Sequence, residues 1–255
     1  MSFVARIRRQ LRRMESTGKR TARSARESVK SPLKRGSASR VNETSRAKRP
    51  RQAFANPSTE GVPGHTLRDA NGGIVFDDVP EFRPRLTPEQ MIRRGVFGGC
   101  YFHPRGGKPG ILYRGAQGIP GVTHEEFPAE WFQGLNPNMY RNRRYDSALN
   151  KYGVSSGQDQ AEWERKGWIR PQDPRGWFQW YCRFFLGRRS EDDDRQISRW
   201  KGVAGPKGRW KRALLNKITR AGVQHDNESV SPVIRQTLLH WAFEVSEKDL
   251  QRHKL

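Results

Sequence analysis

The stretch PQDPRGWFQWYCRFFLGRR, residues 171–189, decides the fold that this sequence predicts. Asp173 and Pro174 are residue types that favour the N-cap and first turn of a helix, and Gly187 is typical of a helix end. The apolar residues between them cover two adjoining helix faces, one with Trp177, Tyr181 and Phe184 and the other with Phe178, Cys182 and Phe185. A helix that is apolar over this much of its surface is buried. We therefore expect a helix from Asp173 to Gly187 at the centre of a domain.

Helical patterns lie on both sides of this central segment, over residues 87–94, 158–166, 190–202, 210–222 and 231–245. The first begins with Thr-Pro-Glu-Gln, the sequence of a capping box with proline at the first helical position. The third begins at Ser190, which we expect to be its N-cap, and it places Ile197 and Trp200 on its buried side. The connections after residue 155 are brief and marked by Gly and Pro, which favours a compact helical bundle.

The region before this bundle is rich in Gly and Pro and contains short apolar runs. Asn-Gly-Gly before residues 74–76 predicts a turn followed by a short strand. Glycines separate similar runs at residues 96–97, 100–102 and 111–113, which we also expect to be strands. The predicted fold is therefore mainly α with a small Gly/Pro-rich β-containing part, an α+β arrangement.

Charge divides the chain into an arm and a body. The chain has 49 Lys and Arg residues against 26 Asp and Glu residues, for a formal net charge of +23. Residues 1–54 hold 17 of the basic residues and three acidic ones, a net charge of +14. This segment has too few apolar side chains to fold alone. We expect three parts: a disordered basic arm with its linker at 1–65, the Gly/Pro-rich segment at 66–135, and a Trp-rich helical domain at 136–255.

A positive charge this large indicates which kinds of partner the protein would bind. Nucleic acid, either DNA or RNA, is the leading candidate. Lys and Arg neutralise phosphates through contacts that ignore base sequence and weaken with salt. The residues that we expect to contact phosphate are, in the arm, Arg46, Lys48, Arg49 and Arg51; beside the central helix, Arg183, Arg188 and Arg189; and in a basic helix further along, Lys207, Arg209, Lys211, Arg212, Lys217 and Arg220. An acidic protein and an anionic membrane surface are the alternative partners.

The arm contains two candidate targeting sequences, which predict different cellular compartments. Lys34 and Arg35, followed after ten residues by Arg46, Lys48 and Arg49, have the form of a bipartite nuclear import signal. The first fourteen residues are amphipathic and Arg-rich, which is also typical of a transit peptide. We expect a nuclear protein, with the mitochondrion or plastid as the alternative.

The sequence predicts neither a cofactor nor a metal site. Cys100 and His103 have the spacing of two metal ligands, but no second pair matches them. Residues 106–110, Gly-Gly-Lys-Pro-Gly, differ from the spacing of a phosphate-binding P-loop. Two cysteines, Cys100 and Cys182, provide no disulfide framework and favour a reducing compartment. No apolar run approaches the roughly 18 residues of a membrane helix, so no transmembrane segment is predicted.

Two other classes of function remain as alternatives. An enzyme acting on nucleic acid, either a nuclease or a base-processing enzyme, would draw on ionisable groups, and the candidates are Asp173, Asp192, Asp193, Asp194, His103, His124 and His240. These residues form no recognisable catalytic set, so none is assigned a role and a non-enzymatic protein is favoured. A structural component of a ribonucleoprotein particle would thread its basic arm between RNA helices. An enzyme is expected to gather several ionisable groups in one cleft, whereas a structural component is not. The sequence indicates neither DNA over RNA nor an oligomeric state.

Overall fold

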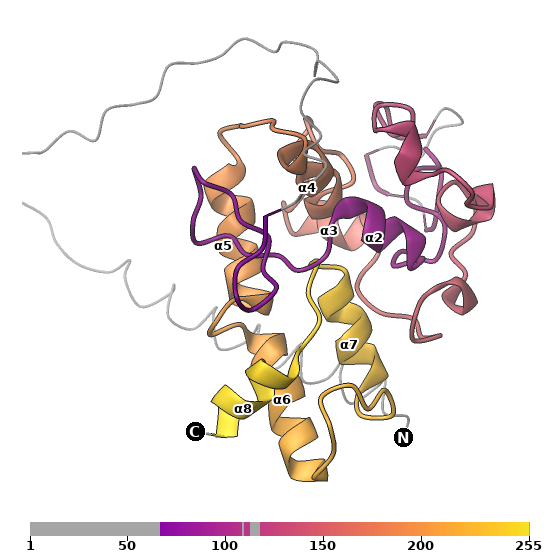
Figure 1. Ribbon diagram of the computed structural model, residues 1–255. Helices are drawn as coiled ribbons and strands as arrows, with labels where there is room; N and C mark the ends of the chain where they lie inside the picture. The colour runs from indigo at the N-terminus through magenta and orange to yellow at the C-terminus, as the bar shows by residue number, and fades with distance from the viewer. Residues whose placement is uncertain (1–66, 109, 113–117, 255) are drawn as a thin grey trace, which may run out of the picture. The chain divides into compact units, whose positions relative to one another are not determined.

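Helices account for all the regular secondary structure in the part of the chain that the computed structural model describes, residues 67–108, 110–112 and 118–254. These residues belong to one compact unit, Ala53–Leu255 (Figure 1). Its α-helices are α2 (Pro88–Arg93), α3 (Gln160–Arg165), α4 (Trp177–Phe185), α5 (Asp193–Ala204), α6 (Arg209–Ala221), α7 (Pro232–Leu239) and α8 (Glu247–Lys254). Three short 3-10 helices, η1 (Ala129–Trp131), η2 (Pro137–Met139) and η3 (Ser147–Leu149), lie between α2 and α3. The mainly helical part of the prediction is confirmed.

Two helices follow their local sequence signals closely. At the start of α2, the Thr87 hydroxyl accepts the Gln90 amide at 3.2 Å and the Gln90 side chain accepts the Thr87 amide at 3.0 Å. This reciprocal pair is the predicted capping box. At the end of α6, Gly222 adopts a left-handed conformation with φ of 65°, which stops the helix as expected. Among the described residues, no helix has the length and apolar content needed to cross a bilayer.

The predicted strands do not form in the described residues, where the only β pairings are two isolated bridges, Arg68 with Ile74 and Arg170 with Asp173. The apolar runs around residue 98 are instead folded into consecutive turns, because Gly95, Gly98 and Gly99 have φ values of 58°, 56° and 78°. A Cβ at Gly95 would overlap the Leu149 carbonyl, so glycine is required there. The β part of the α+β prediction is therefore not confirmed.

Helix α4 begins at Trp177, so the predicted start at Asp173 and Pro174 was wrong. Gly176 precedes the helix with φ of 78° and ψ of −144°, a conformation that interrupts any helix begun earlier. Asp173 caps nothing. Its carboxylate is fully buried and accepts hydrogen bonds from Arg183 and Arg188 at 2.9 and 2.7 Å. A side chain with the chemistry of a cap is used here as the centre of a buried ion cluster.

The hydrophobic core is built around α4 and an aromatic ring from the Gly/Pro-rich segment. Phe82 is fully buried and its ring centroid lies 5.1 Å from Trp200, 5.5 Å from Phe184 and 5.6 Å from Trp180. These separations favour edge-to-face and tilted aromatic packing. One continuous cluster contains buried residues from both 66–135 and 136–255, so the two predicted parts share a core.

Helix α5 begins at Asp193 rather than directly after Ser190, so Ser190 is not its N-cap. The Asp193 carboxylate accepts the Ser190 amide at 2.9 Å and the indole N–H of Trp180 at 2.8 Å. The Asp193 carboxylate therefore connects the first turn of α5 to the core. Ile197 and Trp200 are buried, as predicted.

The last predicted helix, residues 231–245, is shorter in the structure, where only Pro232–Leu239 is helical. Helix α7 ends at Leu239, and Ala242 adopts φ of 54° so that its carbonyl accepts the amides of Arg85 and Leu86 at 2.7 and 3.1 Å. Helix α8 follows, and it packs on α6, as does α7 (Figure 1). Ser246 and Asp249 cap its first turn reciprocally, with Ser246 N to Asp249 Oδ2 at 2.9 Å and Asp249 N to Ser246 Oγ at 3.4 Å.

Candidate nucleic-acid interface

Helix α6 carries five Lys and Arg residues and no acidic residue. Leu214, Leu215 and Ile218 form its buried side and fix its orientation on the core. The helical period then places Arg209, Arg212 and Arg220 on the opposite side, where all three are exposed. Lys207, just before the helix, is exposed as well, and we call these four residues the α6 basic face.

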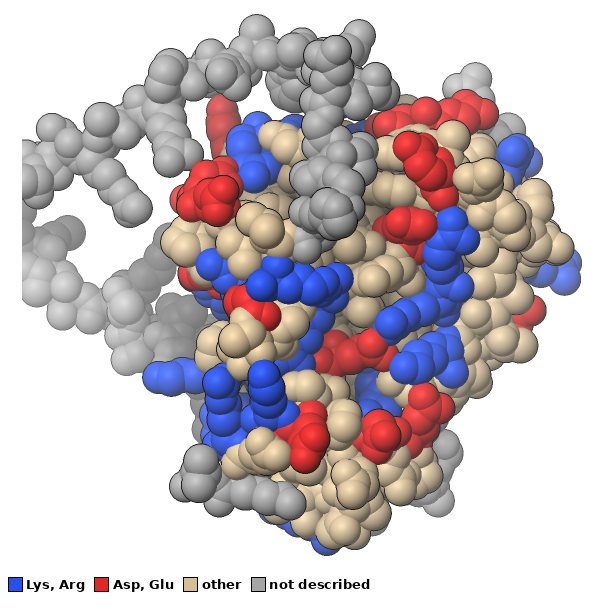
Figure 2. All heavy atoms as spheres, in the orientation of Figure 1, with Lys and Arg blue, Asp and Glu red and all other residues tan. Residues whose placement is uncertain are grey.

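The α6 basic face keeps its charge uncompensated. No carboxylate in the described parts of the chain forms an ion pair with any of its four residues. The Arg209 guanidinium lies 5.2 Å from the Trp210 ring centre, a contact that leaves its positive charge intact. Lys217 and, from α8, Arg252 are also exposed. Figure 2 shows Lys and Arg side chains gathered over α8 and the beginning of α6.

Lys211, which the sequence assigned to phosphate contact, lies on the inner side of α6. Its ammonium group is 2.7 Å from the Asp249 carboxylate of α8, which also accepts a hydrogen bond from Arg85. Burial alone would raise the pKa of Asp249, but the hydrogen bonds from Arg85 and Lys211 and the charge of Arg85 lower it to about 2. The ion cluster therefore fastens α8 to α6 and leaves Lys211 little freedom to meet a partner.

The three arginines near the end of α4 are paired with acids. Arg183 lies 2.9 Å from Asp173 and 2.6 Å from Glu126. Arg188 lies 2.7 Å from Asp173. Arg189 is 2.6 Å from Asp78, and its guanidinium lies 3.8 Å from the Phe184 ring centre. Their charges are largely neutralised within the protein, unlike those of the α6 basic face.

The remaining predicted binding residues belong to the arm. Arg46, Lys48, Arg49 and Arg51, and the import-signal residues Lys34 and Arg35, lie outside the described residues.

The acidic candidates for catalysis do not converge on one site. Burial raises the pKa of Asp192, but the hydrogen bonds and charge of Arg195, at 2.5 and 2.7 Å, lower it below its usual value. Asp193 is held by Trp180, whereas Asp194 is exposed in the first turn of α5. In the described part of the chain, no three His, Cys, Asp or Glu side chains are arranged to hold a metal ion.

The candidate histidines also have separate contacts, because each ring meets a different group of the protein. The His103 ring accepts the Arg105 amide at 3.0 Å, and the His124 ring packs 5.2 Å from that of Phe132. The His240 ring hydrogen-bonds the Val96 carbonyl at 3.0 Å. Burial lowers the pKa of all three, that of His240 to about 4. A small cavity beside α4 contains none of these histidines or aspartates, and its lining is apolar and aromatic: Ile92, Val96, Phe97, Tyr101, Phe102, Met139, Tyr140 and Phe178.

No protein-family model, curated protein or solved structure matches this chain. The candidate interface therefore depends on the geometry and charge of its own residues.

Sequence reasoning missed two groups of exposed cations. Arg252 was overlooked because α8 was not predicted, although Ser246 and Asp249 have the spacing of a capping box and would have indicated the helix. Arg141, Arg143 and Arg144 form a basic run in the sequence but lie in a loop without helical periodicity. This run of arginines in the sequence could have indicated a basic surface.

Proposed function

We propose that this protein binds nucleic acid by placing the α6 basic face against the phosphate backbone. The observation that carries the proposal is a contrast within the described body: the three arginines near the end of α4 and Lys211 of α6 are each paired with a carboxylate, whereas the four residues of the α6 basic face are not. Guanidinium groups match phosphate oxygens with paired hydrogen bonds. A helix of 13 residues is about 20 Å long, the rise of roughly six base pairs.

Such an interface supplies affinity rather than base specificity. Contacts to phosphate displace counterions, so binding is expected to fall steeply as salt rises. Exposed arginines on a helix could also enter a groove, but phosphate contact requires only the charge and exposure described above. We therefore propose general nucleic-acid binding, with the basic arm adding to the same electrostatic attraction.

The enzymatic alternative receives less support from the geometry. Its candidate aspartates and histidines each have separate structural partners, and a catalytic site would gather several of them in one cleft. A structural component of a ribonucleoprotein particle would use the same basic surfaces, so it is a special case of the proposal in which RNA is the preferred ligand.

Binding of the full chain to labelled duplex DNA, single-stranded DNA and RNA across a salt series tests the proposal. The informative variant combines Arg209→Gln, Arg212→Gln and Arg220→Gln. For duplex DNA, the slope of log affinity against log salt should fall by about 0.9 for each phosphate that the variant no longer neutralises. Magnesium is included and probe integrity is checked, because cleavage or base loss would favour the enzyme.

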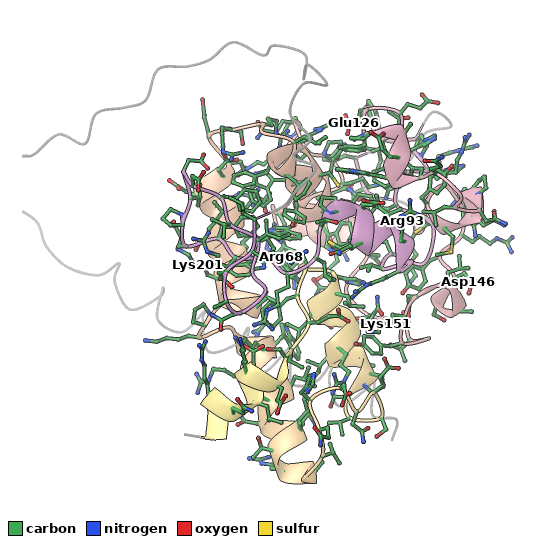
Figure 3. The ribbon with its side chains drawn as sticks, viewed as in Figure 1. Arg68, Arg93, Glu126, Asp146, Lys151 and Lys201 are labelled. Carbon is green, nitrogen blue, oxygen red and sulfur yellow. The ribbon has the colours of Figure 1, made fainter. Side chains whose placement is uncertain are left out.

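A matched control separates the surface from the net charge. Arg93→Gln, Arg165→Gln and Lys201→Gln also remove three positive charges, but these residues are paired with Glu89, Glu162 and Glu81. Arg93 and Lys201 are labelled in Figure 3. The control should bind nearly as well as the unmodified protein. Equal weakening by both triple variants would contradict a localised interface, and no binding at physiological salt would favour an acidic protein or a membrane surface.

A further inference from the structure

Two loops remote from each other in sequence are hydrogen-bonded side by side. The Phe102 amide donates to the Tyr140 carbonyl at 2.9 Å, and the Gly107 amide donates to the Arg143 carbonyl at 3.1 Å. The Arg143 guanidinium returns a hydrogen bond to the Gly107 carbonyl at 3.2 Å. These bonds hold residues 103–108 against residues 140–146, so their side chains project from a fixed backbone.

The first loop is also fixed from beneath. Arg175 is buried, and its guanidinium donates to the carbonyls of His103 and Gly106 at 2.6 and 3.2 Å. At Gly106, a Cβ would overlap the Cys100 carbonyl, which shows how closely the chain folds back on itself. A loop held in this way is preorganised, so the entropic cost of ordering it around a ligand is small.

The joined loops carry five Lys and Arg residues and one acidic residue, Asp146. Arg105, Arg141 and Arg143 are exposed, and within the described ranges no carboxylate forms an ion pair with them. The nearest acid in the second loop is Asp146, whose carboxylate caps η3 by accepting the Ala148 amide at 2.9 Å (Figure 3). We call Arg105, Arg141, Arg143 and His103 the loop cluster.

His103 reports the electrostatics of this cluster. Its Nδ1 accepts the Arg105 amide, so in the neutral ring Nε2 carries the hydrogen and is a donor. Burial lowers the pKa of His103, and the positive charges of Arg105, Arg143, Arg175 and Arg141 lower it further. These arginine charges make the surroundings of the ring positive, which suits an anion.

We propose that the loop cluster is a second phosphate-binding site, which takes a backbone phosphate of the bound nucleic acid. Two or more guanidinium groups on a rigid loop, with an imidazole N–H beside them, match the several acceptor oxygens of a phosphate. The inference rests on the proposed function, and it adds a site built from loops to the one built on α6. Contacts at both would extend the footprint of the protein on its ligand.

Nuclear magnetic resonance of the full chain tests this site directly, because the pKa of His103 responds to an anion beside it. The His103 signal is assigned with His103→Gln and titrated at low salt, alone, with inorganic pyrophosphate, and with a short duplex DNA. Both ligands should raise the pKa of His103 by about one unit or more. Arg141→Gln with Arg143→Gln should abolish the rise and weaken duplex binding several-fold.

The α6 variant, Arg212→Gln with Arg220→Gln, is the matched control. It should weaken duplex binding while the pyrophosphate-dependent rise in the pKa of His103 remains. If duplex DNA binds but the pKa of His103 does not change with either ligand, the loop cluster is not a phosphate site and the proposed function is unaffected. A rise with pyrophosphate but not with bound duplex would also overturn the assignment, whereas absent duplex binding would show failure of the proposed function itself.

Discussion

Lys211 and Asp249 join α6 to α8 through an ion pair of 2.7 Å, whereas Arg212, the next residue in the chain, is exposed and pairs with no described carboxylate. Successive residues of a helix point about 100° apart, so adjacent cations can face the interior and the solvent. One stabilises the fold, and we propose that the other contacts the ligand.

Substitution of these two neighbours should separate stability from binding. Lys211→Gln should lower the free energy of unfolding by about 1.5–3 kcal/mol, the range for a hydrogen bond to a charged group. The effect should not be larger, because Asp249 keeps Arg85 as a partner. Arg212→Gln should not lower the free energy of unfolding, because Arg212 pairs with no described carboxylate, and it should weaken nucleic-acid binding. Urea denaturation and a binding titration measure the two effects, and a reversed pattern would contradict the assigned orientations.

Asp173→Asn should destabilise the protein by about 3–5 kcal/mol, because Arg183 and Arg188 would lose the buried carboxylate between them. Loss of a helix cap would cost only about 1 kcal/mol. Denaturation of this variant beside Asp226→Asn, an exposed acid, distinguishes the two roles. A destabilisation near the smaller value would contradict a central role for the Asp173 carboxylate in holding these arginines.

His240 should make the fold sensitive to acid. Burial lowers its pKa to about 4 from 6.5, so the unfolded chain takes up a proton first as the pH falls. The stability that the neutral ring contributes is complete above pH 6.5 and is lost progressively toward pH 4, by up to about 1.4 kcal/mol per pH unit. The pKa values of His103 and His124 are also lowered, so the difference between the unmodified protein and His240→Gln isolates this residue. That difference should shrink as the pH falls, and a constant difference would be incompatible with a titrating His240.

Trp180→Ala should cost about 3–5 kcal/mol, since the side chain is fully buried and its indole N–H holds Asp193. Trp210→Ala is the control, because Trp210 is partly exposed and contacts Arg209 at the surface. This control should be destabilised much less. Similar melting temperatures for both variants would show that α4 is not the centre of the core.

Removal of residues 1–54, which carry a net charge of +14, should weaken nucleic-acid binding and flatten its salt dependence. The described body should keep its helical circular dichroism and cooperative unfolding, because its core lies within residues 82–250. Binding as tight as that of the full chain at every salt concentration would exclude a role for the arm.

Local chemistry was enough to predict some helices and not others. Thr87 with Gln90, and Gly222 at the end of α6, act on neighbouring backbone groups, so their sequence signals were sufficient. Asp173 has the same local chemistry as a cap, but its use depends on Arg183 and Arg188, ten and fifteen residues away. The glycine-separated apolar runs were mistaken for strands because contacts such as Gly95 against Leu149 decide their path.

The predicted phosphate-binding residues likewise include some whose surroundings depend on distant parts of the chain. Arg189 and Arg212 are equivalent in a sequence count, but Arg189 meets Asp78 from a segment 111 residues away and Arg212 meets no described acid. Only the tertiary fold distinguishes them. Composition predicts that a basic surface exists, and packing decides which cations form it.

The uncompensated charges of the α6 basic face also affect the stability of the protein without its ligand. Their mutual repulsion is present only while the chain is folded closely enough to bring them together, so it opposes folding. Added salt screens this repulsion and also screens attraction to phosphate. Salt should therefore raise the melting temperature of the free protein over the same range in which it releases nucleic acid.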